Sequence, residues 1–192
     1  MSNIFLLIAR IIINVPAILL AGGGVFSRKE SIKGDITRWR DLGKVQFRND
    51  FFALLELLNS FKEFRNIFYL RYRSLRHLRL LMPPLSSLYI NTEDIGQGLF
   101  FQHGFSSVVS AKSIGKNSWI NQQVTIGHTA QGSPIIGDNV RIGAGAIVIG
   151  NIKIGNNVTI AAGATVNMDV PDNSLVVPQK ARIIENHIVS KQ

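Results

Sequence analysis

The 192-residue sequence contains no cysteine at all. This absence excludes a disulfide framework, a thiolate zinc site and a cysteine nucleophile. It fits a reducing compartment, so we expect a cytoplasmic protein. With 46% hydrophobic residues, the chain has enough apolar material to bury a core, which excludes a disordered or low-complexity protein.

The sequence also lacks a long uninterrupted apolar run. The most apolar long stretch is Ile4 to Ala21, but Arg10, Asn14 and Pro16 interrupt it. A spanning helix needs about 20 mostly apolar residues, and a charge at its centre is costly. A signal peptide would carry its positive charge ahead of the apolar run. Two interpretations stay open: a helix packed on the protein or a partner, or a segment lying at the membrane surface.

Acidic residues are scarce, with 12 Asp and Glu against 21 Lys and Arg, and the net charge of +9 is unevenly placed. Residues 1–90 hold 14 basic and 6 acidic residues, whereas residues 91–192 hold 7 and 6. A basic surface suits a polyanion, a membrane face or a phosphorylated ligand. No zinc-finger, helix-turn-helix or RNP motif accompanies the charge, so we expect no nucleic-acid partner.

Residues 1–90 are predicted to form a basic, apolar α-helical region. NDFFALLELLNSF and FKEFRNIFYLRYRSLRHLRLL both have helical apolar spacing, and Met82-Pro83-Pro84 ends helix formation. The second stretch predicts a basic amphipathic helix or helix pair. Its arginines either form a solvated face or meet anionic lipid headgroups, an anionic carrier lipid or a partner subunit; they are Arg65, Arg71, Arg73, Arg76 and Arg79.

Beyond residue 90 the large aliphatic residues recur every six positions. One register runs Ile136, Ile142, Val148, Ile154, Ile160 and Val166, and an earlier one runs Val108, Ile114, Ile120 and Ile126. The step of ten between the two registers is one period plus four inserted residues within HTAQGSP. This period matches short strands joined by tight turns, each repeat pointing one aliphatic inward. We therefore predict a hexapeptide-repeat parallel β-helix over 91–175, an outward-projecting insertion, and a tail over 176–192.

Several segments of this region resemble the serine acetyltransferase family of hexapeptide-repeat acyltransferases. They are GLFFQHGFSSVVSAKSIGKN, WINQQVTIGH, PIIGDNVRIGAGAIVIGNIKIGNNVTIAAGATV and DVPDNSLVV. The resemblance implies an all-β left-handed β-helix after the α-helical region, a homotrimer with active sites between neighbouring β-helices, and acetyl-CoA as cosubstrate. It also implies that His103 is the catalytic general base.

The chemistry of acetyl transfer agrees with that role. A hydroxyl is a weak nucleophile at neutral pH, and a largely neutral imidazole can accept its proton. Backbone N–H groups at Gly127 or Gly145 could hold the developing oxyanion. His128 is a second candidate for the base. Glu93 and Asp94 are the nearest carboxylates in the sequence that could orient His103.

The same resemblance indicates where acetyl-CoA would bind. Small residues at coil edges leave room for a pantetheine arm, at Gly143, Ala144, Ala161 and Ala162. Lys180 and Arg182 fit contacts to the CoA phosphates, because a cation there meets an anionic tail. No metal is expected.

The chain departs from the family pattern at the acceptor side. Gln102 replaces an Asp before the catalytic His, Gly132 and Ser133 replace an Arg-His pair, and Leu88 replaces the orienting Asp. An amino-acid acceptor needs partners for its carboxylate and ammonium groups, so these changes count against free L-serine.

The ending V-V-P-Q-K-A-R at residues 176–182, the HG-x-x-x-VV form that begins at His103 and the basic, apolar N-terminal region together more closely resemble the colanic acid and capsule polysaccharide acetyltransferases. We therefore predict an acetyl-CoA-dependent O-acetyltransferase acting on a sugar hydroxyl in surface polysaccharide biosynthesis, in the free or lipid-linked precursor, at the inner face of the membrane. The alternatives are a serine O-acetyltransferase of cysteine biosynthesis, a non-catalytic β-helix scaffold, and a different acyl donor such as succinyl-CoA.

Overall fold

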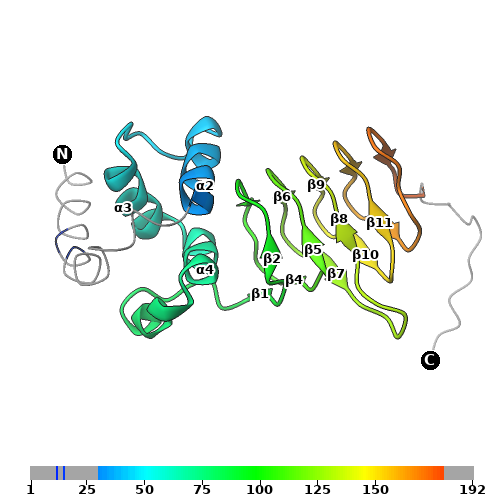
Figure 1. Cartoon of the computed structure of the whole chain (residues 1–192), viewed down its shortest axis with the longest axis horizontal. Coiled ribbons are helices and arrows are strands. Elements are labelled where there is room, and N and C mark those ends of the chain that lie inside the picture. Colours follow the sequence, from blue (N-terminus) through cyan, green and yellow to red (C-terminus); the bar gives the residue numbers. More distant parts are fainter. Residues whose placement is uncertain (1–11, 13–14, 16–29, 180–192) are drawn as a thin grey trace, which may run out of the picture.

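The computed structural model of the chain describes residues 12, 15 and 30–179 (Figure 1). The membrane-surface alternative for Ile4 to Ala21 and the phosphate contacts of Lys180 and Arg182 fall on residues outside that description. Helices occupy one end of the long axis, and strands stack along the rest of it. Within the described residues, no helix is both long and apolar enough to cross a membrane.

Between residues 30 and 87, three α-helices and one 3-10 helix build the first part: α2 (Glu30–Asp41), α3 (Asp50–Ser60), α4 (Lys62–Arg71) and η1 (Arg73–Leu80). The helix pair predicted from the basic stretch is thus α4 followed by η1. Helix α3 begins where the Asn49 side chain accepts hydrogen bonds from the N–H groups of Phe51 and Phe52. Phe61 has an extended backbone, which separates α3 from α4.

The remainder is a parallel β-helix of five coils, which confirms the fold predicted from the six-residue period. Its sheets run in the orders β1-β4-β7-β10-β13, β2-β5-β8-β11 and β3-β6-β9-β12-β14. In the fifth coil Val170 takes the place of a strand in the second sheet, through a bridge to Ile154. The strands are β1 (Leu88–Ile90), β2 (Asp94–Ile95), β3 (Phe100–Phe101), β4 (Ser107–Val109), β5 (Ser113–Ile114), β6 (Trp119–Ile120), β7 (Thr125–Gly127), β8 (Ile135–Ile136), β9 (Arg141–Ile142), β10 (Ile147–Ile149), β11 (Lys153–Ile154), β12 (Thr159–Ile160), β13 (Thr165–Val166) and β14 (Leu175–Val176).

One aliphatic column fills the β-helix, as the period requires. The six members of the register from Ile136 to Val166 are each no more than 2% exposed, and so are Ile114, Ile120 and Ile126 of the earlier register. The inward position predicted for Val108 is wrong, because Val108 is 39% exposed and its neighbour Val109, which pairs with Ile126, fills the column instead. The predicted insertion lies between β7 and β8, where Thr129 and Gly132 form an isolated antiparallel bridge. The column stays continuous because the additional residues leave the coil at this corner.

Stacked asparagines line the corner between the second and third sheets. Asn117, Asn139, Asn157 and Asn173 all have φ between 55° and 60°, a left-handed conformation that asparagine tolerates. The side-chain amide of each donates to the side-chain oxygen of the next, at 3.2, 3.0 and 3.0 Å. We call these four residues the asparagine ladder.

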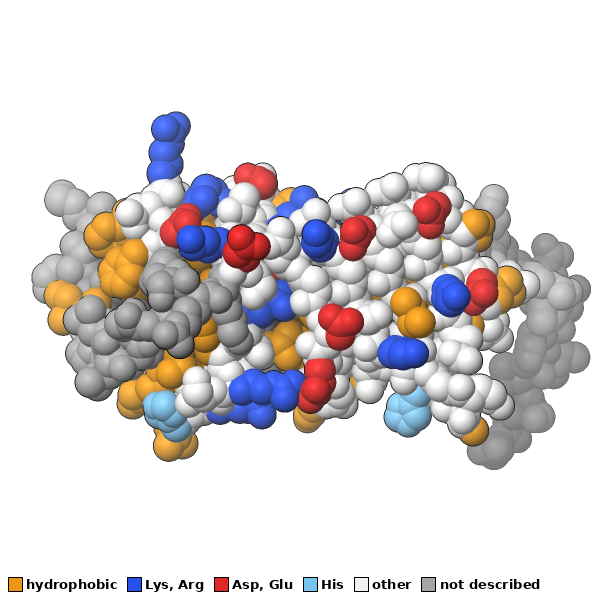
Figure 2. All heavy atoms as spheres, viewed as in Figure 1, with side chains coloured by type: hydrophobic (Ala, Val, Ile, Leu, Met, Phe, Trp, Pro, Cys, Tyr) orange, Lys and Arg blue, Asp and Glu red, His pale blue; other side chains and the backbone are white. Residues whose placement is uncertain are grey.

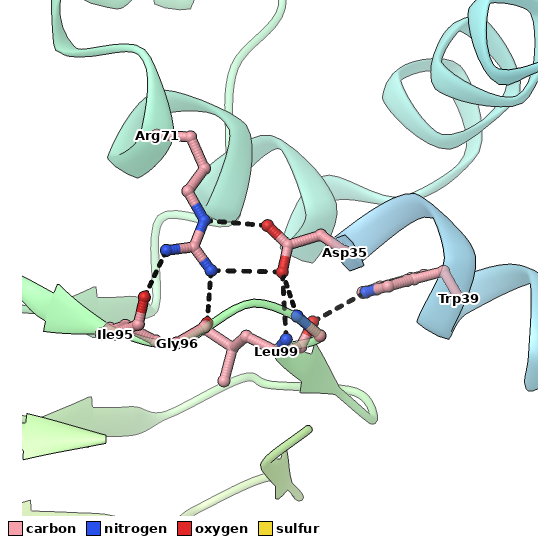
Figure 3. Close-up of polar contacts among 7 residues, drawn as sticks. Asp35, Trp39, Arg71, Ile95, Gly96 and Leu99 are labelled. Carbon is pink, nitrogen blue, oxygen red and sulfur yellow. Dashed lines mark hydrogen bonds and ion pairs between the residues drawn. The ribbon is translucent and has the colours of Figure 1, made fainter. Parts of the chain in front are cut away.

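A buried ion pair joins the helices to the first coil (Figure 3). The Arg71 Nε lies 2.8 Å from the Asp35 Oδ2, and Arg71 also donates to the carbonyl oxygens of Ile95 and Gly96, both at 2.6 Å. Asp35 is fully buried and also accepts the N–H groups of Gly98 and Leu99. Burial raises the pKa of the Asp35 carboxyl, against the opposing effect of Arg71. The prediction of a solvated or partner-facing role is therefore wrong for Arg71.

Aromatic side chains also join the helices to the first coils of the β-helix. Trp39 of α2 donates its indole N–H to the Leu99 carbonyl and packs edge-on against Phe100 of β3. Phe100 in turn packs edge-on against Trp119 of β6. The Arg141 guanidinium of β9 lies 4.5 Å from the centroid of the Trp119 ring. The helical region and the β-helix therefore share one core.

Candidate active site

His103 lies at an irregular corner of the first coil. Between the buried strand residues Phe101 and Ser107 there are five residues, whereas the same corner has three residues between Ile120 and Val124. The hydrogen bond from the Gln123 N–H to the Phe105 carbonyl aligns the two corners, so His103 and Gly104 are the additional pair. His103 is exposed and has φ 67°, a left-handed conformation that it shares with other non-glycine residues at the corners, such as Gln123 and Asn139.

A cavity of about 160 Å³ opens beside His103, at the junction of the helices and the first coil. Two charged side chains of opposite sign line it, Lys44 and Glu63. The aromatic and polar remainder of the lining is Trp39, Phe61, Phe100, Phe101 and Gln102. An imidazole, a cation and a carboxylate therefore border one small space.

Local structure fixes the two charged residues. Gly43 has φ 69° and ends α2, and the Lys44 N–H donates to the Trp39 carbonyl at 3.0 Å, which holds Lys44 at the helix end. Glu63 stands in the first turn of α4. Its Cγ would lie 3.1 Å from a Cβ added at Gly104, so Glu63 packs closely against the corner that bears His103.

The carboxylates proposed from the sequence lie elsewhere. Glu93 pairs with Arg73 at 2.8 Å, and Asp94 begins β2 on another sheet. Neither lines the cavity beside His103, and Leu88 is an apolar residue buried to 4% exposure. Sequence reasoning missed Lys44 and Glu63, because no motif or spacing connects them with His103.

The predicted pantetheine-binding residues share the edge of the β-helix that bears His103. This edge joins the third sheet to the first, and its corners stack through hydrogen bonds from Gly145 N–H to the Gln122 carbonyl and from Gly163 N–H to the Ala144 carbonyl. A Cβ added at Gly145 would meet nothing within 4 Å, so the edge is open at that corner. A Cβ added at Gly143 would lie 2.5 Å from the Ala162 backbone nitrogen, so Gly143 is needed for the close packing of two coils and leaves no open space there. The small residues on this edge are Gly143, Ala144, Gly145, Ala161 and Ala162.

Gly127 and His128 lie at a different corner. Gly127 ends β7 in the first sheet, and exposed His128 leads into the insertion before β8 in the second sheet. The structure therefore brings together His103 and the five small residues, but it does not bring His128 or Gly127 to their edge. No group of three His, Asp or Glu side chains close enough to hold a metal ion occurs among the residues the structure describes.

Comparisons with known proteins agree with this architecture. Residues 133–167 match the family model described as bacterial transferase hexapeptide (six repeats). A serine acetyltransferase of Synechocystis sp. is 46% identical over 114 residues, which cover 54% of this chain and 46% of that protein. A serine acetyltransferase of Staphylococcus aureus is 45% identical over 96 residues, covering 47% and 45%. The chain thus spans less than half the length of these curated relatives.

Solved structures extend the match into the helices. The Neisseria gonorrhoeae serine acetyltransferase in complex with serine has a TM-score of 0.64 and 27% identity, covering 89% of this chain and 73% of that chain. The soybean serine acetyltransferase apoenzyme has a TM-score of 0.57 and 30% identity, covering 83% and 72%. These four relatives are named for serine acetylation and not for polysaccharide acetylation. From the repeats, the coils and this similarity we conclude that the chain belongs to the serine acetyltransferase family of hexapeptide-repeat proteins.

Proposed function

We propose that the protein is an acetyl-CoA-dependent O-acetyltransferase whose general base is His103. The observation that carries the proposal is the additional corner pair, which sets an exposed imidazole beside a small cavity and on the edge of the small residues. His103 accepts the hydroxyl proton as the acceptor oxygen bonds to the thioester carbonyl carbon. The carbon–sulfur bond then breaks, and the CoA thiolate leaves and takes up that proton.

L-Serine is the acceptor that the cavity supports best. An amino-acid zwitterion needs an anion for its ammonium group and a cation for its carboxylate. Glu63 and Lys44 supply this pair in the cavity that His103 borders. The names of the relatives support the same acceptor. In this proposal Glu63, which lines the same cavity as His103, also takes the orienting role that Glu93 and Asp94 were expected to fill.

Acetyl-CoA would lie along the edge of small residues. His103 belongs to the first coil and Ala162 to the fourth, so about 14 Å separates their levels at roughly 4.8 Å per coil. That span suits an extended pantetheine arm. Of the two glycines considered for the oxyanion, Gly145 shares the edge of His103 and is the better candidate. Lys180 and Arg182 remain the predicted phosphate contacts.

A sugar hydroxyl of a surface polysaccharide precursor is the second candidate acceptor. Gln102 and Leu88 favour this acceptor. By the family resemblance each stands in place of an aspartate, which would serve either an amino-acid substrate or the catalytic base. The excess of positive charge in residues 1–90 would suit a precursor carried on an anionic lipid at the inner membrane face.

We also propose that copies of the chain associate as a homotrimer through the first sheet. Outward residues that pair in register across β1, β4, β7, β10 and β13 are all uncharged and exposed: Tyr89, Val108, Thr125, Ile147 and Thr165. An uncharged sheet face suits burial against a second copy. Because β4 follows the His103 corner directly, such contact would set the site between neighbouring copies.

The test is release of CoA thiol from acetyl-CoA by the purified protein, with L-serine or a nucleotide sugar as acceptor. We expect serine-dependent release, a loss of about 10²–10⁴-fold in His103→Ala, and no change in His77→Ala, an exposed histidine of η1. Lys44→Gln and Glu63→Gln should raise the KM for serine by roughly tenfold, which corresponds to one charge-assisted hydrogen bond.

Each other result selects an alternative. Release that depends on the sugar and is lost in His103→Ala supports the second acceptor. Activity with succinyl-CoA alone changes the donor and keeps the base. Wild-type rates in His103→Ala would remove the base, and a β-helix that releases no thiol with any of these substrates would be a scaffold.

A further inference from the structure

A second cavity, of about 280 Å³, lies between α4, η1 and β1. We propose that it binds the phosphate group of a ligand that is neither acetyl-CoA nor the acetyl acceptor. The donor-bearing side chains of its lining are Asn66, Arg76, Arg79, Ser86, Tyr89 and Asn91, of which Tyr89 also belongs to the sheet face proposed above for the homotrimer. None of the lining residues is a carboxylate. This inference is independent of the function proposed above.

The wall of this cavity is anchored to α4. Asn66 donates its side-chain amide to the carbonyls of Leu85 and Leu88 at 3.1 and 3.2 Å, and its side-chain oxygen accepts the Leu85 N–H at 2.9 Å. Arg65 donates to the Pro83 carbonyl at 2.9 Å. With the bond from the Leu85 N–H to the Lys62 carbonyl at 3.3 Å, five hydrogen bonds hold segment 83–88 against α4, so the cavity has a fixed wall.

The arginines of the basic stretch divide into two groups. Arg71 is bound to Asp35, Arg73 pairs with Glu93, and Arg65 donates to backbone carbonyls. In contrast, Arg76 and Arg79 form no ion pair within the described part of the chain, and both line the second cavity. Only these two therefore keep their charge available to a ligand.

Contacts with a neighbouring aromatic ring also position the Arg79 side chain. The Arg79 guanidinium lies 5.3 Å from the centroid of the Tyr69 ring, and the Tyr69 hydroxyl donates to the Met82 carbonyl at 2.9 Å. A guanidinium stacked on a ring keeps its N–H donors free at its edges. Guanidinium groups bind phosphate through paired, charge-assisted hydrogen bonds, so a phosphate monoester or diphosphate suits this cavity best.

Two sources could present such a phosphate, a soluble ester or a lipid headgroup. Leu80 and Leu81, directly after Arg79, are 93% and 69% exposed, which adds an apolar rim that a lipid surface would cover. Figure 2 shows hydrophobic and basic side chains close together at the lower edge of the helical end. The recognised chemistry is the same in both cases, and the experiment separates them.

The experiment uses the full chain with saturating CoA, so that the predicted CoA site is filled. Inorganic pyrophosphate is titrated by calorimetry, and flotation is measured with phosphatidylcholine vesicles with and without phosphatidic acid. The test variant is Arg76→Gln with Arg79→Gln. Its control is Arg48→Gln with Lys116→Gln, which removes the same charge from two other exposed residues.

We expect saturable binding of pyrophosphate or of phosphatidic-acid vesicles, weakened roughly 10- to 100-fold in the test variant and within about twofold of wild type in the control. Binding of pyrophosphate alone identifies a soluble ester. If the protein binds phosphatidic-acid vesicles and the double substitution Leu80→Ser with Leu81→Ser abolishes this binding, the ligand is a lipid headgroup. The inference is overturned if wild type binds neither probe, if test and control variants behave alike, or if the probe binds only when CoA is left out.

Discussion

The β-helix and the helical region reach stability by different means. The coils of the β-helix repeat the contacts of their neighbours, with aliphatic side chains in the column and, in the four coils after the first, an asparagine in the ladder. The helical region instead depends on contacts that occur once, above all the buried pair of Asp35 and Arg71. Stability is therefore shared among many similar contacts in one region and concentrated in a few in the other.

The candidate site uses both kinds of structure. The repeats supply a regular edge of small residues, on which one additional corner pair displays His103. The helical region supplies charges, since Lys44 follows α2 and Glu63 begins α4. A repetitive scaffold cannot easily bring single charges of opposite sign to one place, and the junction with an irregular region does so.

The largest effect on stability should come from Asp35→Ala. It leaves the Arg71 guanidinium buried without its carboxylate and removes the acceptor of two backbone N–H groups. We expect a loss of about 3–5 kcal/mol in the free energy of unfolding, measured by urea denaturation. Asp41→Ala, an exposed carboxylate at the end of the same helix, should change it by less than about 0.5 kcal/mol. Equal small losses in both would show that the helical region does not depend on this pair.

An intermediate effect should follow Asn157→Ala. The substitution breaks two rungs of the asparagine ladder and forces alanine into φ 55°. We expect a loss of about 1–2 kcal/mol, since the left-handed conformation costs this much for a residue with a Cβ. Asn157→Gly should lose less in the same unfolding experiment, because glycine adopts positive φ without that cost. If Asn157→Gly loses as much unfolding free energy as Asn157→Ala, the side-chain hydrogen bonds of the ladder stabilise the corner, and the backbone conformation contributes little.

The smallest effect should come from Arg141→Gln, which removes the cation above the Trp119 ring. An exposed cation–π contact is worth about 0.5–1 kcal/mol. Thermal unfolding followed by tryptophan fluorescence reports both the stability and the Trp119 environment. Lys153→Gln, an exposed cation on β11, is the matched control and should have no effect. If Arg141→Gln lost more unfolding free energy than Asn157→Ala, the view that single surface contacts contribute little to the stability of the β-helix would be wrong.

The β-helix could be predicted in detail because its physical cause is periodic. Ile142 and Ile160 point into the column for the same reason, so counting positions locates both. The role proposed for His103 came from a family resemblance, and the structure adds the two additional corner residues that distinguish its position from the other corners. Lys44, Glu63 and the burial of Arg71 depend on how helices pack on the first coil. Such packing joins residues distant in sequence, and one sequence carries no local signal for it.

The asparagine ladder has a direction as well as a spacing. Each amide donates toward the later coil, and Asn139 and Asn157 stand 18 residues apart, one complete coil. Duplicating such a segment would give the new asparagine one donor below and one acceptor above, so two equivalent rungs would replace the one that the insertion interrupts, and the other rungs would stay unchanged. The β-helix can therefore change length in evolution by whole coils, each moving its C-terminal end by about 4.8 Å, while the junction that holds His103 keeps its geometry.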